Sequence, residues 1–172
     1  VPGQLAFLPD GQSLVVSIAN QAVAQPLSLI RLITGHEGAV TTASLVPDGT
    51  AIVSGGMDKT VRLWTVADGK STKTFTGATD AITDLSISTN GLTLVASSAD
   101  KNVRLWNLAQ AVPAVAPTAT LLHTAIVRGV SINADGTRIA TSGDDKIVRV
   151  FDVATGRELQ RFTDHEAAAL AV

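Results

Sequence analysis

The chain has 172 residues, of which 45% are apolar, a formal net charge of −2 and no cysteine. The lack of cysteine excludes disulfide and thiolate chemistry, and the small charge gives no overall attraction to nucleic acid or to an anionic membrane. The apolar content is enough to build a core, and no run of 18 apolar residues predicts a membrane helix.

Taken in chain order, the sequence alternates short apolar-polar strands with tight turns, which predicts β-strands. Residues 4–34 form a shortened and degenerate first unit with a turn at Asp10-Gly11. The first full copy begins with AVTTASLV (39–46) and turns at Pro47-Asp48-Gly49. It continues with three more strands, at 51–56, 60–66 and 71–77.

Two further copies follow, with their first turns at Asn90-Gly91 and Asp135-Gly136. The pattern Asp-Lys-X-Val-Arg-X-aromatic marks the third strand of each copy, and its starts lie 42 and 45 residues apart, at 58–64, 100–106 and 145–151. A period of this size is typical of a blade of four short strands, and such units bury their apolar faces only by stacking. Helix signals are nearly absent, so the chain is predicted to be all-β.

One stretch departs from the alternation, namely AQAVPAVAPTAT (109–120). It is three residues longer than the corresponding connection one copy earlier. We predict a lengthened surface loop between the third and fourth strands of that copy, and not a linker between domains.

The three histidines, His36, His123 and His165, fall at one phase of the repeat, and Gly35 precedes the first of them. With Ser54, Asp58 and Trp64 in the same copy, this pattern resembles the WD-repeat family of β-propellers. The resemblance implies that His36, Ser54, Asp58 and Trp64 form a buried hydrogen-bonded network, and their donors and acceptors can satisfy one another. It covers residues 35–166 well and 4–34 loosely.

The later copies keep only part of the implied network. The second has Ala78 and Ala96 where His and Ser or Thr are expected, and retains Asp100 and Trp106. The third retains His123, Thr141 and Asp145, and has Phe151 in place of Trp. These losses put the network in doubt in the second copy and weaken it in the third, while the fold prediction rests on period and alternation.

Three chemical alternatives fit less well. A Ser-His-Asp catalytic site is needed only once, whereas this set recurs in partial form in successive copies. Histidines at one phase of adjacent blades lie too far apart to bind a single zinc ion. The repeated Lys and Arg of the third strands are expected to be a solvated face of each blade rather than a nucleic-acid stripe, because aromatic residues are only 3%. We therefore expect no catalytic, cofactor or metal site.

The fold prediction is a single WD-type propeller segment over residues 1–172, with four-stranded antiparallel blades. The expected blades are 1–34, 35–76, 77–121 and 122–163, and residues 164–172 begin the next unit. Three arrangements remain open: part of a longer ring, half of an eight-bladed ring made by two copies, or a closed four-bladed ring. Exposed terminal blades would favour self-association or docking of further blades.

The resemblance implies a non-catalytic scaffold for protein–protein interaction, with other proteins as partners and neither nucleic acid nor membrane. The alternative is a regulatory or docking propeller within a larger multidomain enzyme. The N-terminal residues lack the basic start of a signal peptide, so the cytoplasm is the default expectation, although the compartment stays undecided. The expected contact surface is the rim formed by the turns around the repeated Asp and the Gly-His loop, at Glu37, Met57, Thr79, Asp80, Ala99, Thr124 and Asp144.

Overall fold

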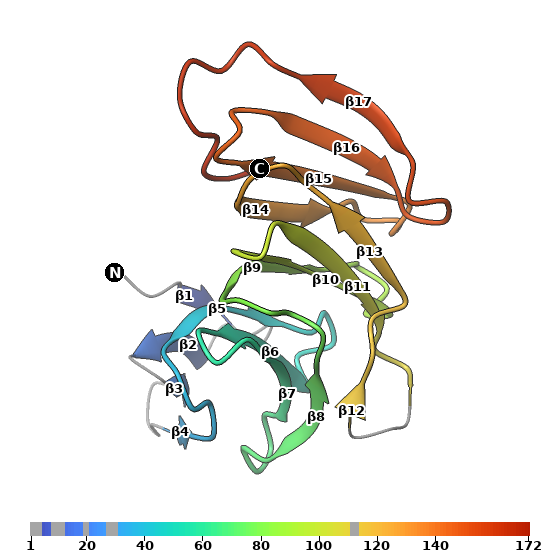
Figure 1. Ribbon diagram of the computed structural model, residues 1–172. Coiled ribbons are helices and arrows are strands. Elements are labelled where there is room, and N and C mark those ends of the chain that lie inside the picture. Colours follow the sequence, from blue (N-terminus) through green and yellow to red (C-terminus); the bar gives the residue numbers. More distant parts are fainter. Residues whose placement is uncertain (1–4, 8–12, 19–20, 27–30, 111–113) are drawn as a thin grey trace.

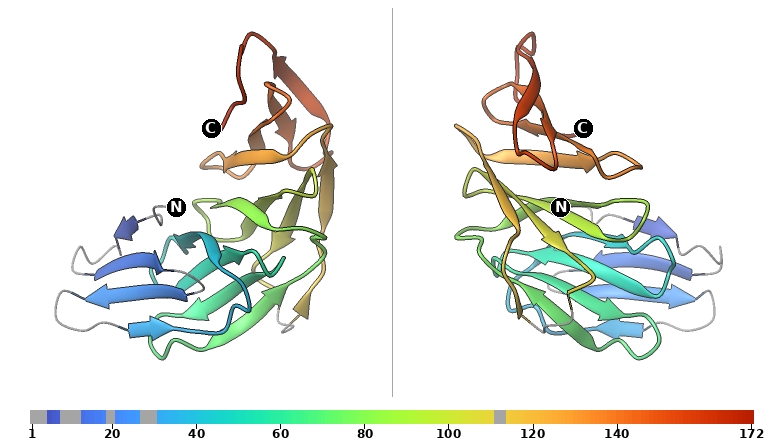
Figure 2. Two further views of the ribbon diagram at one scale, coloured as in Figure 1. Left: turned by 60° about the vertical axis from the view of Figure 1, so that its left-hand side comes forward. Right: turned by 90° about the vertical axis from the view of Figure 1, so that its right-hand side faces the viewer.

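The computed structural model describes residues 5–7, 13–18, 21–26, 31–110 and 114–172, and the predicted Asp10-Gly11 turn lies outside these ranges. Every regular element in them is a β-strand, which confirms the all-β prediction. Four sheets follow one another along an open arc, with the first and last sheets at its two ends (Figures 1 and 2).

Each sheet is one blade with four antiparallel strands of its own, joined mostly by short turns, and the sheet of blade 2 carries a fifth strand in addition. Blade 1 consists of β1 (Leu5–Phe7), β2 (Ser13–Ile18), β3 (Gln21–Pro26) and β4 (Arg31–Ile33). Blade 2 consists of β5 (Val40–Leu45), β6 (Ala51–Gly56), β7 (Val61–Thr65) and β8 (Ser71–Phe75). Blade 3 consists of β9 (Ile82–Ile87), β10 (Thr93–Ser98), β11 (Asn102–Asn107) and β13 (Ala119–Leu122). Blade 4 consists of β14 (Val127–Ile132), β15 (Arg138–Gly143), β16 (Val148–Asp152) and β17 (Glu158–Phe162).

The turn chemistry explains why the strands end where they do. Gly49, Gly91 and Gly136 have φ near +70° in the turns between the first and second strands, a conformation that glycine adopts without a steric penalty. In the first of these turns the Asp48 carboxylate accepts hydrogen bonds from the backbone N–H and the hydroxyl of Thr50, at 2.9 and 2.7 Å. The predicted turn residues therefore favour the antiparallel pairing of the first two strands in blades 2, 3 and 4.

The strand β12 (Ala114–Val115) departs from the expected pattern. It belongs by sequence to the connection between the third and fourth strands of blade 3, but it pairs in parallel with β8 of blade 2 (Figure 1). The side chain of Val115 is fully buried beside Phe75 and Trp106. The prediction of a surface loop is thus wrong for these residues, because an apolar side chain in the connection reaches the core between the two blades.

The core lies between neighbouring blades, in three seams. The 1–2 seam contains Ile33, Ile52 and Trp64. The 2–3 seam is centred on Phe75 and Trp106, and the 3–4 seam contains Leu121 and Phe151. Each blade therefore buries its apolar faces only by contact with its neighbours.

Blade 4 has one face that no described residue covers. Phe75, Leu121 and Phe162 occupy the same position in the fourth strands of blades 2, 3 and 4, and they are 1%, 5% and 50% exposed. The C-terminal residues run along the edge of this blade, where the backbone N–H of Ala169 donates to the carbonyl of Gly143 at 3.2 Å. The position that is sealed in blades 2 and 3 is thus half open in blade 4.

Candidate functional site

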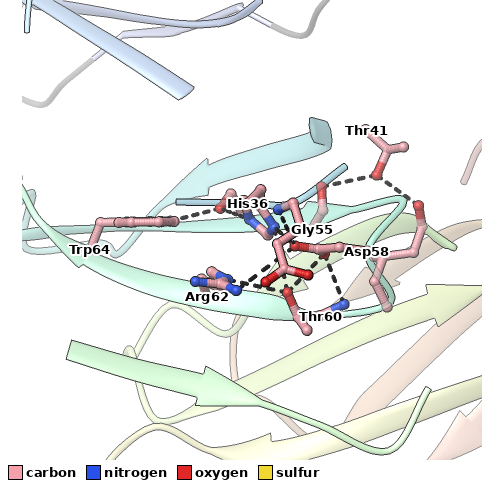
Figure 3. Close-up of polar contacts among 10 residues, drawn as sticks. His36, Thr41, Gly55, Asp58, Thr60, Arg62 and Trp64 are labelled. Carbon is pink, nitrogen blue, oxygen red and sulfur yellow. Dashed lines mark hydrogen bonds and ion pairs between the residues drawn. The ribbon is translucent and has the colours of Figure 1, made fainter. Parts of the chain in front are cut away.

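In blade 2 the residues His36, Ser54, Asp58 and Trp64 are joined in one chain of hydrogen bonds (Figure 3). The Nδ1 atom of His36 lies 2.8 Å from Oδ2 of Asp58, and its Nε2 atom lies 2.7 Å from Oγ of Ser54. The Trp64 indole N–H donates to the same Oγ at 2.7 Å. Thr60 adds to the Asp58 end through its hydroxyl, 2.8 Å from Oδ1.

The direction of these bonds follows from the titration of the two end groups. Burial lowers the pKa of His36 below 6.5, although the hydrogen bond with Asp58 opposes this shift. Burial acts to raise the pKa of Asp58, but the hydrogen bonds from Thr60 and His36 outweigh it and the pKa lies below its usual value. At neutral pH a neutral His36 therefore donates from Nδ1 to an ionised Asp58, and the Ser54 hydroxyl donates to Nε2 of His36.

The same geometry is that of a Ser-His-Asp catalytic set, so the environment of the hydroxyl has to be weighed. Ser54 is fully buried, and its Oγ already accepts the Trp64 indole N–H. A substrate carbonyl would have to displace Trp64 and enter the blade to meet this oxygen. The arrangement therefore binds the segment before the first strand of blade 2 to the second and third strands.

In blade 3 the equivalent positions hold Ala78 and Ala96, and the network is different. Asp100 pairs with Arg104, whose Nη1 lies 2.8 Å from Oδ2, and it accepts the backbone N–H of Thr79 at 2.8 Å. The indole N–H of Trp106 is buried and has no acceptor among the described residues. Replacing His and Ser by alanine has thus left the tryptophan in place without its hydrogen-bond partner.

The polar network of blade 4 is intermediate between those of blades 2 and 3. His123 contacts the Thr141 hydroxyl through Nε2 at 2.8 Å, and its ring packs against Phe151 with the centroids 5.4 Å apart. Asp145 accepts from Thr124 and Arg149, each at 2.8 Å. The acid and the histidine, which are hydrogen-bonded in blade 2, here have separate partners.

The repeated basic residues divide into two groups. Arg104 and Arg149 are only 7% and 4% exposed, and each pairs with the Asp four residues earlier. The expectation that the third-strand arginines lie on a solvated face is wrong for these two, because the repeated Asp holds each guanidinium inside the blade. The repeated lysines Lys59, Lys101 and Lys146 are exposed, with φ between 65° and 69°.

Sequence reasoning missed a second set of polar contacts, which joins one blade to the next. The Thr41 hydroxyl donates to the carbonyl of Ile82 in blade 3 at 2.7 Å, and the Thr83 hydroxyl donates to that of Val127 in blade 4 at 2.6 Å. Both threonines sit at a bulge in the first strand of a blade. Their only signal in the sequence is the repeat of Thr at one position.

Asp84, which follows Thr83 on β9, was also missed by sequence reasoning. Its Oδ2 accepts the backbone N–H of Val130 in blade 4 at 3.1 Å, and its Oδ1 lies 3.4 Å from the Thr42 hydroxyl in blade 2. Burial raises the pKa of this carboxyl, against the hydrogen bonds that it accepts. One carboxylate therefore connects the innermost strands of three blades.

The seven residues predicted for the rim lie at one end of blades 2, 3 and 4, in the turns before the first strand and between the second and third. Glu37, Asp80 and Met57 are exposed, the last at 58%. Ala99 is partly exposed, and its backbone N–H donates to Ala81. The hydroxyls of Thr79 and Thr124 contact the repeated Asp residues, and Asp144 accepts two hydrogen bonds from Arg128.

Nothing in the described part of the chain gathers three or more His, Asp or Glu side chains as a metal site would require. His165 is exposed in the C-terminal segment, apart from His36 and His123. The described residues also contain no helix that is long and apolar enough to cross a membrane.

Comparison with known proteins decides the family. The sequence model described as "WD domain, G-beta repeat" matches residues 27–65, 69–107 and 116–152. The chain belongs to this WD-repeat family. Each matched stretch spans the fourth strand of one blade and the first three strands of the next, which confirms the resemblance and the propeller-type fold.

The relatives include the guanine nucleotide-binding protein subunit beta of Arabidopsis thaliana, 32% identical over 178 residues, which cover 93% of this chain and 47% of the relative. The subunit of the same name from Solanum tuberosum is 31% identical over 173 residues, covering 90% of this chain and 45% of the relative. A ribosome biogenesis protein BOP1 homolog of Leishmania infantum is 52% identical over 40 residues, 23% of this chain and 5% of that protein. The chain spans about half the length of the beta subunits that it matches.

Proposed function

We propose that this WD-repeat chain is a non-catalytic scaffold for protein–protein interaction, and that its partner surface is the rim of blades 2 to 4. The observation that carries this proposal is where the reactive groups lie. The Ser-His-Asp set of blade 2 is bonded within that blade, with the hydroxyl fully buried. The rim exposes a series of turns on neighbouring sheets, and loop residues held by a rigid scaffold commonly form binding surfaces.

The rim combines rigid turns with chemically varied side chains. Each turn is fixed by a hydrogen bond to the segment before the first strand, such as the bond from the Met57 N–H to the Ala39 carbonyl at 2.8 Å. Met57 supplies an adaptable apolar contact, and Glu37 and Asp80 supply charge. A preformed surface of this kind loses little conformational entropy on binding.

The names of the relatives support an assembly role. Two of them are described as subunits of a guanine nucleotide-binding protein, so each works as part of a larger complex. We infer that this chain likewise acts in a complex with other proteins.

The half-open face of blade 4 supports a further part of the proposal. Blade 4 buries Val103 and Leu121 of blade 3, while Phe162 in the position of Leu121 is half exposed. We infer that another blade of the same repeat type covers this face. Light scattering of the 172-residue chain should show association, with binding of a hydrophobic dye; a stable monomer that binds no dye would contradict this.

Two double variants test the rim. Glu37→Arg with Met57→Arg changes the rim, and Ala67→Arg with Ala134→Arg places two arginines on exposed turns at the opposite end of blades 2 and 4. Proteins captured by the unchanged chain from its source cells should be depleted at least tenfold on the first variant and retained on the second, with equal melting temperatures. Equal capture by both variants would remove the rim as the partner surface.

A further inference from the structure

The outer part of the 3–4 seam contains a hollow of about 470 Å³. It lies between blade 3 and the turn after β16 in blade 4. In blade 3 it is lined by the start of β10, the end of β11 and the start of β13. Its lining includes Leu92, Leu105, Ala119 and Val153 together with the polar residues Asn90 and Asn107, and no residue that lines it is charged. Leu92 is half exposed. We call this hollow the 3–4 groove.

The corresponding place in the 2–3 seam is filled. Lys73 and Ala119 occupy the same position in the fourth strands of blades 2 and 3, because Lys73 pairs with Leu63 and Ala119 pairs with Leu105. The Lys73 ammonium donates a hydrogen bond to the carbonyl of Leu108 in blade 3. The lysine therefore crosses the 2–3 seam, whereas the methyl group of Ala119 leaves the 3–4 seam open.

A chain segment also occupies the outer edge of the 2–3 seam. The connection Leu108–Thr118 in blade 3 supplies β12, which pairs with the edge of β8 and buries Val115. In blade 4 the equivalent connection is only Val153–Arg157. It is too short to send a strand back to β13, which is the unpaired edge of the sheet of blade 3.

We propose that the 3–4 groove and the edge of β13 together bind an extended, uncharged and apolar segment of a partner protein, as the 2–3 seam binds β12. Unpaired backbone groups on β13 would supply main-chain hydrogen bonds, and the groove would take small apolar side chains of the segment. The inference rests on the proposed scaffold function and adds a second contact surface, on the side of the blades rather than on the rim.

The chemistry of the surface selects this type of ligand. The uncharged lining offers no counter-ion, so a charged side chain would lose its hydration there without compensation. Leu122 on β13 is 78% exposed beside this edge. Small uncharged residues such as the Ala and Val of residues 109–120 suit this lining.

The probe is the chain's own segment, a labelled synthetic peptide with the sequence AQAVPAVAPTAT of residues 109–120, titrated against the intact protein by fluorescence anisotropy. We expect saturable binding, and at least a tenfold loss of affinity when Asp replaces the two valines of the peptide. Binding should also slow hydrogen exchange along β13. No saturable binding, or slower exchange along β8 alone, would overturn the inference.

The matched protein variants are Ala119→Lys, which copies Lys73 of the 2–3 seam, and Gln160→Lys, at the same position in β17 of blade 4. The first should weaken peptide binding at least tenfold and the second should leave it unchanged. Unchanged binding by Ala119→Lys would place the peptide elsewhere and overturn the inference. If Ala119→Lys lowers the melting temperature, Leu92→Ser gives the same test at another residue of the groove.

The peptide-binding test of the 3–4 groove can fail or succeed independently of the capture test of the rim. Variants of Glu37 and Met57 test the scaffold surface, and they lie at the other end of the blades from Leu92. Loss of partner capture in the rim variants with no peptide binding would retain the proposed function and remove the groove. Peptide binding that depends on Ala119, with partner capture independent of the rim, would do the reverse.

Discussion

Blades 2 and 3 share one backbone plan, but they hold their third strands in different ways. In blade 2 a neutral histidine connects Asp58 to Ser54, and Ser54 accepts the indole N–H of Trp64. In blade 3 the histidine and the serine are absent, Asp100 turns to Arg104, and the indole of Trp106 keeps its packing without a hydrogen bond. The difference indicates that the aromatic side chain is needed for packing, while the polar network around it can be replaced.

The largest expected effect comes from removing the aromatic anchors. Trp64→Ala and Trp106→Ala should each lower the free energy of unfolding by about 3–5 kcal/mol, because both side chains are buried between blades. Urea unfolding followed by circular dichroism measures both. If Trp106→Ala costs less than half as much as Trp64→Ala, hydrogen bonding and not packing carries the blade.

Next come the two acids, which have different partners. Asp100→Ala should cost about 3 kcal/mol, because it leaves the Arg104 guanidinium, whose side chain is 8% exposed, buried and unpaired. Asp58→Ala should cost only about 1–2 kcal/mol, because its partner His36 is neutral and Arg62 is 21% exposed. The same urea experiment ranks them. The reverse order would mean that the histidine network is the stronger of the two.

A smaller change should repair blade 3. Ala96 occupies the position of Ser54, opposite the third-strand arginine. Ala96→Ser should therefore give Trp106 an acceptor and raise the free energy of unfolding by about 1 kcal/mol. The matched control is Ala96→Ser in a Trp106→Phe background, where phenylalanine has no N–H to donate. An equal gain in both backgrounds would assign the effect to something other than this hydrogen bond.

The smallest effect concerns pH and separates the blades that contain a buried histidine from blade 3. Burial lowers the pKa of His36 and of His123 below 6.5 in the folded chain. The unfolded chain then binds more protons than the folded one at mildly acidic pH, so stability falls as the pH drops below about 6.5.

Melting temperatures between pH 7.5 and 5.5 test this effect. His36→Gln should flatten the decline, as should His123→Gln, whereas the exposed His165→Gln is the control and should retain it. Neighbouring charges at His36 come from Asp58 and Arg62. A decline unchanged in both buried-histidine variants would assign the acid sensitivity to other groups.

Much of this architecture could be predicted from the sequence, because its repeat period and its turn residues act locally. The strands of blades 2 to 4 follow from alternation and from turns such as Asp48-Gly49 and Asp135-Gly136. The family match confirms the WD-repeat resemblance, which is carried by Gly35-His36 and the third-strand pattern. The replacement of His and Ser by Ala78 and Ala96 already indicated that the network would be incomplete in the second full copy.

The features that escaped prediction all depend on contacts between blades or on a residue's burial. The arginine at position 104 looks the same in sequence as a solvated one, and only the folded sheet shows that Asp100 encloses it. The links made by Thr41, Thr83 and Asp84 join residues of different blades, which no local pattern reveals. The strand β12 was missed because a segment rich in alanine and proline has a weak strand propensity, and its pairing with β8 decides its structure.

The pairing of β12 with β8 has a consequence for how the molecule unfolds. Each blade is otherwise completed by its own strands, and repeat arrays of that kind can lose one terminal unit at a time. Here the connection in blade 3 supplies the last strand of the sheet of blade 2, so neither blade can open without breaking the pairing of β12 with β8. Blades 2 and 3 should therefore behave as a single cooperative unit, and blade 4, with no such clasp, should be the first of the three to fray.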